Sequence, residues 1–349
     1  MKISSSAGRR KHELQTAFSP VQFSNINPMQ IRQVLVFSLI IGALPAQAAD
    51  NSCTLKKPDA AWIKRAADAW QLTVRDSLHI TERGGAVSGV FFDSNCVYRG
   101  APDIAKRGEP HTGLITLPDG KQIPPAVTSF AAPDEKHRGA FMVMALPEIW
   151  RAGKVESDLT LETLMVAVYV HEMTHTRQFA SISPLIDVVD KRWKLGDDLN
   201  DDIVQTRFKD TPEFVTAFDA ERTLLFNAAA ATTDVEAKSF AREALARITA
   251  RRTHFFAGDD EKLAELEDIF LTMEGTAQWA AYKWVAHPKG GRFSPEVALR
   301  NMRRGGRQWS QDEGLALYLV IDRLVPGWTT RTFTDQPATA LTLLAEAAR

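Results

Sequence analysis

The residues best suited to chemistry are two histidines, with a glutamate directly after the first, in the run HEMTH at positions 171–175. The run falls in a segment, 158–180, whose apolar residues recur at helical spacing. On a helix, His171 and His175 share one face, and both imidazoles can reach one Zn²⁺ at about 2.0–2.1 Å. Glu172 is turned about 100° from His171, so it lies beside the ion and can take a proton from an activated water. Because zinc has no redox chemistry, the pattern predicts hydrolysis.

A third zinc ligand is needed, because a catalytic zinc ion keeps three protein ligands and one open position. Two glutamates, Glu221 and Glu274, stand in the apolar stripes of later predicted helices. A carboxylate is unfavourable there unless a cation or hydrogen-bond donors meet it. Either residue is therefore a candidate ligand. Gln178 lies three residues after His175 on the same helical face and is expected to hold a ligand or the substrate by a hydrogen bond.

The HEMTH run on one helix, followed on a later helix by EGTA at positions 274–277, resembles the gluzincin class of zinc metallopeptidases. The resemblance covers mainly residues 158–180 and 260–286. It implies that His171, His175 and Glu274 bind one zinc ion. Glu172 would then be the general base and later the proton donor. The 98 residues between the second histidine and Glu274 form a longer interval than many gluzincins have. Glu221 therefore stays open as an alternative ligand or as a side chain that orients an imidazole.

The substrate side of the site is less defined. In such peptidases an edge strand before the metal-binding helix aligns an extended peptide, and the apolar strand Phe141–Leu146 is expected to do so here. The candidates for stabilising an oxyanion are Tyr318 and Tyr282, with His254 and His287 behind them. Each of these four is equally well explained as a packed or surface residue.

The remaining pattern predicts an α+β protein. A small N-terminal lobe, 49–156, is expected to hold a short, mainly antiparallel sheet. A large, mostly α-helical part, 157–349, is expected to carry a zincin-like metal helix. Apolar periodicity and turn residues predict helices at 59–78, 158–180, 212–231, 235–253, 260–286, 295–303, 310–324 and 337–348, and strands at 86–92, 114–117, 123–130 and 140–146.

The first 48 residues are typical of a secretory signal peptide, in which Arg32 precedes the apolar run Val34–Leu44 and an A-x-A cleavage pattern ends at Ala48. The apolar run spans roughly 16 Å as a helix, which is too short to cross a membrane. A true start at Met29 would give a leader of ordinary length. We therefore expect a periplasmic or secreted protein with no membrane span in the mature chain.

The two cysteines of the chain, Cys53 and Cys96, both lie in the predicted mature part, where an oxidising compartment favours a disulfide between them. The formal net charge of the whole chain is −1. The predicted leader has a net charge of +4, so the mature chain has a net charge of −5. This balance argues against a nucleic-acid-binding protein, which would show a clear basic excess.

Together these patterns predict an exported zinc metallopeptidase that hydrolyses peptide bonds in a peptide or protein substrate. Two alternatives remain at this point. One is a non-catalytic zinc-binding scaffold or binding protein, and the other is a zinc amidohydrolase that acts on a cell-wall component. The presence of Glu172 argues against the scaffold, because a purely structural zinc site needs no general base.

Overall fold

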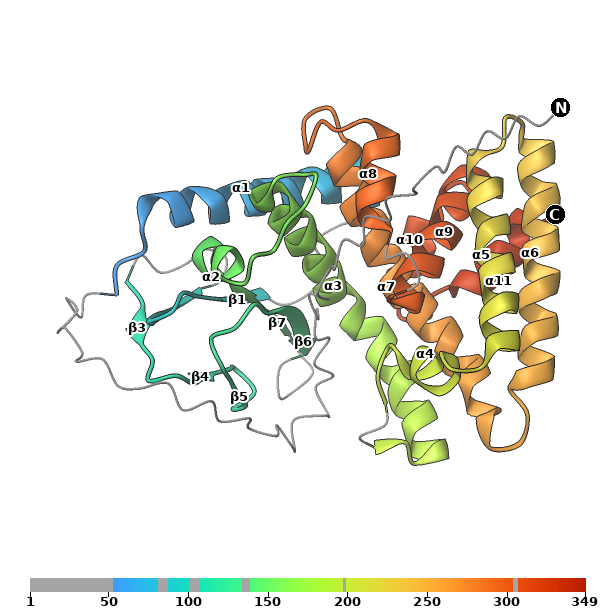
Figure 1. Ribbon diagram of the computed structural model, residues 1–349, viewed down its shortest axis with the longest axis horizontal. Helices are drawn as coiled ribbons and strands as arrows, with labels where there is room; N and C mark the ends of the chain where they lie inside the picture. Colours follow the sequence, from blue (N-terminus) through green and yellow to red (C-terminus); the bar gives the residue numbers. More distant parts are fainter. Residues whose placement is uncertain (1–52, 81–86, 101–106, 134–138, 197–198, 304–306) are drawn as a thin grey trace, which may run out of the picture.

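The computed structural model describes residues 53–80, 87–100, 107–133, 139–196, 199–303 and 307–349. The leader predicted at 1–48 lies outside these described residues. A small sheet lies on one side of the long helix α3 (Leu161–Trp193), and most of the other helices lie on its opposite side (Figure 1). The predicted α+β fold is thus confirmed. Within the described ranges, no helix is long and apolar enough to span a membrane.

Five strands form the main sheet in the order β3-β2-β1-β7-β6. The pair β1 and β7 is parallel and the other three pairs are antiparallel, so the sheet is mainly antiparallel, as predicted. The strands of this sheet are β1 (Val87–Phe92), β2 (Cys96–Gly100), β3 (Glu109–Pro110), β6 (Ser129–Pro133) and β7 (Ala140–Ala145).

Strand β7 lies inside the sheet, so the expectation that Phe141–Leu146 forms an edge strand is wrong. Its two sides pair with β1 and β6, and all six of its residues are buried. An uninterrupted apolar run is typical of a strand that is covered on both faces. The edge of the sheet nearest α3 is instead β6, which packs on that helix.

Two prolines, Pro124 and Pro125, divide the single strand predicted at 123–130. Before them, β5 (Gln122–Ile123) pairs with β4 (Ile115–Thr116) in a separate two-stranded sheet. After them, β6 begins at Ser129. Because proline has no N–H to donate, the pair interrupts the ladder and lets the chain pass from one sheet to the other.

The predicted helices are present with small shifts at their ends. The main exception is α3, which has 33 residues and continues past Pro184. Its extension buries Ile182 and Val189 against α7, and this tertiary packing sustains the helix beyond the predicted end. Three short helices, α2, α4 and α10, were not predicted. Apart from α3, the helices are α1 (Lys57–Thr73), α2 (Pro147–Ala152), α4 (Ile203–Phe208), α5 (Pro212–Ala230), α6 (Asp234–Phe255), α7 (Lys262–Ala286), α8 (Pro295–Met302), α9 (Trp309–Leu324), α10 (Thr329–Thr332) and α11 (Ala340–Ala347), together with a π-helical segment at Val74–Leu78 that continues α1 and a short 3₁₀ helix at Gly258–Asp260.

The predicted disulfide is confirmed between Cys53 and Cys96, whose Cα atoms are 5.7 Å apart. It joins the segment before α1 to the first residue of β2. Helix α1 in turn packs on α3 and α7. The start of the described chain is therefore held to both the sheet and the long helix.

Two glycines allow α7 and α9 to approach closely where they cross. A Cβ atom on Gly275 would lie 2.6 Å from the carbonyl oxygen of Gly314. A Cβ atom on Gly314 would lie 2.6 Å from the Cα atom of Gly275. These separations are too short for any side chain, so both positions require glycine. Gly275 directly follows Glu274, so the crossing fixes the helix beside this candidate ligand.

Candidate metal centre

Three of the predicted site residues meet where α3 and α7 pack together. His171 and His175 come from α3 and Glu274 from α7, and all three side chains are buried. The two Nε2 atoms are 2.9 Å apart. The Nε2 atom of His171 lies 3.3 Å from one oxygen of Glu274, and that of His175 lies 3.4 Å from the other. Within the described part of the chain, this is the one group of three or more such side chains that could hold a metal ion.

The hydrogen bonds on the far side of each imidazole determine which nitrogen faces the centre. The Nδ1 atom of His171 lies 3.0 Å from the side-chain oxygen of Gln278, and that of His175 lies 2.9 Å from the side-chain oxygen of Gln178. An amide oxygen only accepts, so each Nδ1 donates. In neutral imidazoles both Nε2 atoms then present lone pairs to the carboxylate of Glu274. Such a set of buried acceptors calls for a cation between them, either a metal ion or a proton.

The spacing of these atoms fits a small tetrahedral ion. Ligands held about 2.0–2.1 Å from a tetrahedral zinc ion lie about 3.3 Å from one another. The two distances from nitrogen to oxygen, 3.3 and 3.4 Å, match this value. The 2.9 Å distance between the nitrogens is somewhat shorter. The residues present therefore fit one metal ion with two imidazole ligands and one carboxylate ligand.

Without a metal, a proton occupies this position. Burial lowers the pKa of His175, but the charge and hydrogen bond of Glu274 outweigh it, and the pKa is raised to about 9. Burial likewise acts to raise the pKa of Glu274, but the charge of His175 and the hydrogen bonds from both imidazoles lower it well below its usual range. The carboxylate is thus ionised, as a metal ligand must be.

Glu172 lies beside the ligands, next to His171 in the chain. Burial raises its pKa, and the negative charge of Glu274 adds to this effect, whereas the two imidazoles act in the opposite direction. Ser129, the first residue of β6, faces the carboxyl and lowers its pKa. A carboxyl whose pKa is raised by burial is suited to accept and return a proton near neutral pH.

Glu221 does not join this group, although it was predicted as an alternative ligand or a partner of an imidazole. Its carboxylate forms an ion pair with Arg251, at 2.6 Å, and both side chains are fully buried. Arg251 belongs to α6 and also pairs with Glu267 of α7. The cation that permits a carboxylate in this apolar stripe is therefore an arginine.

The four candidates for stabilising an oxyanion lie apart from the ligand group. Tyr318 is buried against Trp328, with its hydroxyl facing threonines, which accounts for it by packing. Tyr282 is partly buried and faces Asp322 and Glu296. His254 is exposed and stacks edge-on with Phe255, and the Nε2 atom of His287 lies 3.5 Å from Asp76.

Two residues near the centre were not predicted. Gln278 stands four residues after Glu274, and this spacing on one helical face could have identified it. Its amide nitrogen donates to the backbone oxygen of Met302. Asp202 immediately precedes α4, and its pKa is raised to about 6 by burial and then by the charge of Glu274. It lies in an irregular segment, where periodicity gives no signal.

Comparison of this chain with family models, curated proteins and solved structures found no match.

Proposed function

We propose that this chain is an exported zinc-dependent metallopeptidase of the gluzincin type. The observation that carries the proposal is the acceptor-only group of His171, His175 and Glu274, with Glu172 beside it. Two imidazoles and one carboxylate, with a fourth position left for water, are the ligand set typical of catalytic zinc. A zinc ion bound there would polarise the scissile carbonyl and lower the pKa of water.

Glu172 would perform the proton transfers of the reaction. Its carboxylate accepts a proton from the attacking water and then delivers this proton to the nitrogen of the leaving amine. Gln178 and Gln278 keep the two imidazoles in the tautomer that presents Nε2 to the centre. A purely structural zinc site would require neither a general base nor an open position.

Strand β6 replaces β7 as the element proposed to align the peptide. It is the edge strand of the sheet that packs on α3, and its first residue faces Glu172. An extended peptide can add to such an edge through main-chain hydrogen bonds, which places its carbonyl groups over the metal-binding helix. The disulfide between Cys53 and Cys96 supports export, because disulfides persist in oxidising compartments.

The proposal is tested by measuring the zinc content of the mature protein and its cleavage of a mixed peptide library, with and without a chelator. We expect one zinc ion per chain and cleavage that the chelator stops and zinc restores. Glu172→Gln is expected to retain zinc but lose about 10²–10⁴-fold in turnover. Glu162→Gln is the matched control, because this glutamate lies on α3 but forms an exposed ion pair with Arg151.

A zinc-loaded protein that cleaves no peptide would refute the peptidase function. Cleavage of a cell-wall amide in its place would identify an amidohydrolase. Cleavage that is unchanged in Glu172→Gln would refute the role given to this residue.

A further inference from the structure

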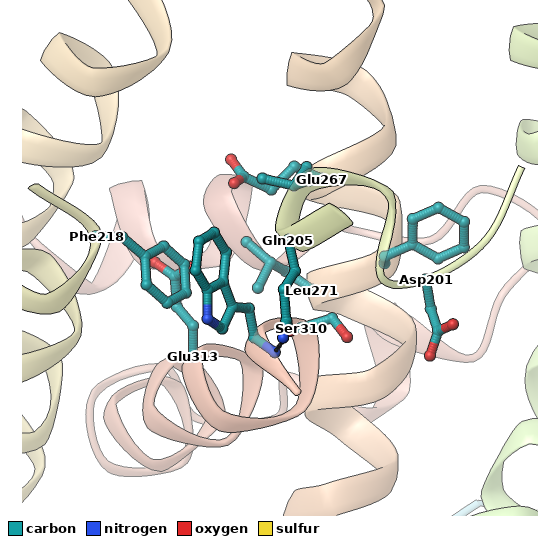
Figure 2. Close-up of a pocket in the computed structure, with 10 residues that line it drawn as sticks. Asp201, Gln205, Phe218, Glu267, Leu271, Ser310 and Glu313 are labelled. Atoms are coloured by element: carbon teal, nitrogen blue, oxygen red, sulfur yellow. Dashed lines mark hydrogen bonds between the residues drawn. The ribbon is translucent and has the colours of Figure 1, made fainter. Parts of the chain in front are cut away.

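Five ionisable side chains from four helices meet inside the helical part of the molecule, and none of them belongs to the metal-binding group. Arg251 of α6 pairs with Glu221 of α5 at 2.6 Å and with Glu267 of α7 at 3.0 Å. Arg252, the next residue of α6, pairs with Glu267 at 2.7 Å. The fifth is Glu313 of α9, which lines a small cavity between α4, α5, α7 and α9 (Figure 2). These five residues form the buried ion-pair cluster.

The carboxyl groups of Glu221 and Glu313 meet without a donor between them. One oxygen of Glu221 accepts a hydrogen bond from Arg251. Its other oxygen and both oxygens of Glu313 are buried and receive no hydrogen bond. The two carboxyl groups are nevertheless in hydrogen-bond contact with each other. Two ionised carboxylates only accept, so this contact needs a proton on one of them.

The charges of the cluster lead to the same conclusion. With every group ionised, Glu221, Glu267 and Glu313 carry three negative charges, whereas Arg251 and Arg252 carry two positive charges. One negative charge is then left in the interior, where it is strongly unfavourable. One proton on the contact between Glu221 and Glu313 removes this charge and supplies the missing donor.

Other charged side chains near α9 do not compensate for this charge. Asp312 of α9 pairs with Arg222 of α5. Asp268 of α7 accepts a hydrogen bond from the backbone at the start of α11 and adds only negative charge. The one ionisable side chain of α11, Glu346, forms an exposed ion pair. Asp201, on the lining of the cavity, is half-buried, so water can solvate its charge.

A water molecule is the competing way to satisfy these oxygens, because the cavity has room for about one. Water can donate hydrogen bonds to Glu313, but it leaves the excess negative charge in place. Burial raises the pKa of Glu313, and the charge of Glu221 adds to this effect. Burial also raises the pKa of Glu221, to about 7, although Arg251 acts in the opposite direction. Both shifts favour the shared proton.

We propose that Glu221 and Glu313 share one proton in the folded protein and act as a pH-sensitive lock on the packing of α5, α6, α7 and α9. Loss of the proton leaves two carboxylates that repel each other across the contact between α5 and α9. The lock therefore weakens as the pH rises. It does not depend on the proposed peptidase function.

The sign and the pH range follow from the two states of the chain. In the unfolded chain a glutamate has a pKa of about 4.3, so above this pH the pair has lost its proton. In the folded protein the pair keeps the proton up to about pH 7. A group whose pKa is raised by folding stabilises the protein at low pH and loses this effect as the pH rises. Between about pH 4.3 and 7 the pair should therefore raise the unfolding equilibrium constant about tenfold per pH unit.

Urea denaturation of the full chain, at equal zinc content and at about pH 5.5 and 6.5, tests the lock by comparing the unaltered protein with Glu313→Gln. Glutamine keeps a donor for Glu221 and removes one negative charge, so it imitates the protonated state at every pH. We expect the ratio of the unfolding constants, unaltered protein over variant, to rise about tenfold between the two pH values. The control Glu265→Gln removes an exposed carboxylate of α7 that pairs with Arg192, and its ratio is expected to stay constant.

A ratio for Glu313→Gln that does not change with pH would overturn the proposal, because both carboxyl groups would then be ionised and hydrated. If Glu313→Gln does not fold, Glu221→Gln takes its place and must give the same tenfold change, since it removes the same shared proton. Failure of both variants to fold would also overturn the proposal, because an amide should replace a protonated carboxyl group at this contact.

Discussion

Zinc binding is expected to displace a proton from His175 at neutral pH. In the metal-free protein the pKa of His175 is raised to about 9, chiefly because the charge of Glu274 outweighs burial. A group with this pKa is about 97% protonated at about pH 7.5, so one zinc ion releases about one proton. At about pH 10 the protonated fraction is about 0.1, and the release nearly disappears. The apparent affinity for zinc therefore falls about tenfold for each pH unit below about 9.

Titration calorimetry in buffers of different ionisation enthalpy measures this release directly. The slope of the apparent binding enthalpy against the ionisation enthalpy of the buffer gives the number of protons released per zinc ion. An NMR titration of the metal-free protein provides a second measurement, because it follows His175 without any metal. Glu274→Gln removes the charge that raises the pKa, so the titration of His175 should move back toward its ordinary value of about 6.5.

A slope near zero at about pH 7.5 would refute the reasoning, because it would mean that His175 is neutral before zinc binds. An unchanged titration of His175 in Glu274→Gln would refute the cause assigned to the shift.

Two further predictions concern the groups that surround the centre. Gln278→Leu removes the acceptor that orients His171, so zinc affinity, measured by competition with a chelator, is expected to fall about 10–100-fold. The control is Gln336→Leu, which changes an exposed glutamine. Equal zinc affinities in the two variants would contradict the role given to Gln278. Arg251→Met leaves the buried Glu221 without its cation, while Glu267 keeps Arg252, and the change is expected to reduce the free energy of unfolding by about 3–5 kcal/mol in urea denaturation. The control Arg247→Met breaks an exposed ion pair on the same helix and should change the free energy of unfolding by no more than about 1 kcal/mol. Similar losses in the two variants would show that the buried ion-pair cluster contributes no more to stability than the exposed pair.

The metal centre could be predicted from sequence as far as it depends on neighbours along one helix. The spacing of His171, His175 and Gln178 places them on one face of α3, and the structure brings all three together. Glu274 and Glu221 show the same signal, a carboxylate in an apolar stripe. What separates them is Arg251, which comes from another helix and meets Glu221. Periodicity within a segment carries no information about such contacts between helices.

The fold shows the same limit. Periodicity located most of the helices, but it ended α3 too early, because the packing of Ile182 and Val189 on α7 is a tertiary effect. Strand β7 was recognised as a strand, but its place in the sheet depends on which strands pair with it. The continuous apolar run was the one local sign that this strand lies inside the sheet.

The distance along the chain between the ligands determines when the metal can be captured. The two histidines lie on α3, whereas Glu274 lies on α7, and 98 residues separate it from His175. During synthesis or refolding, a nascent α3 can offer only a weak two-imidazole site. Full affinity arises after α7 has docked and the crossing at Gly275 and Gly314 has closed. Acquisition of a metal at the proposed centre would therefore be a late event, and a fully loaded centre would report that α3 and α7 have assembled.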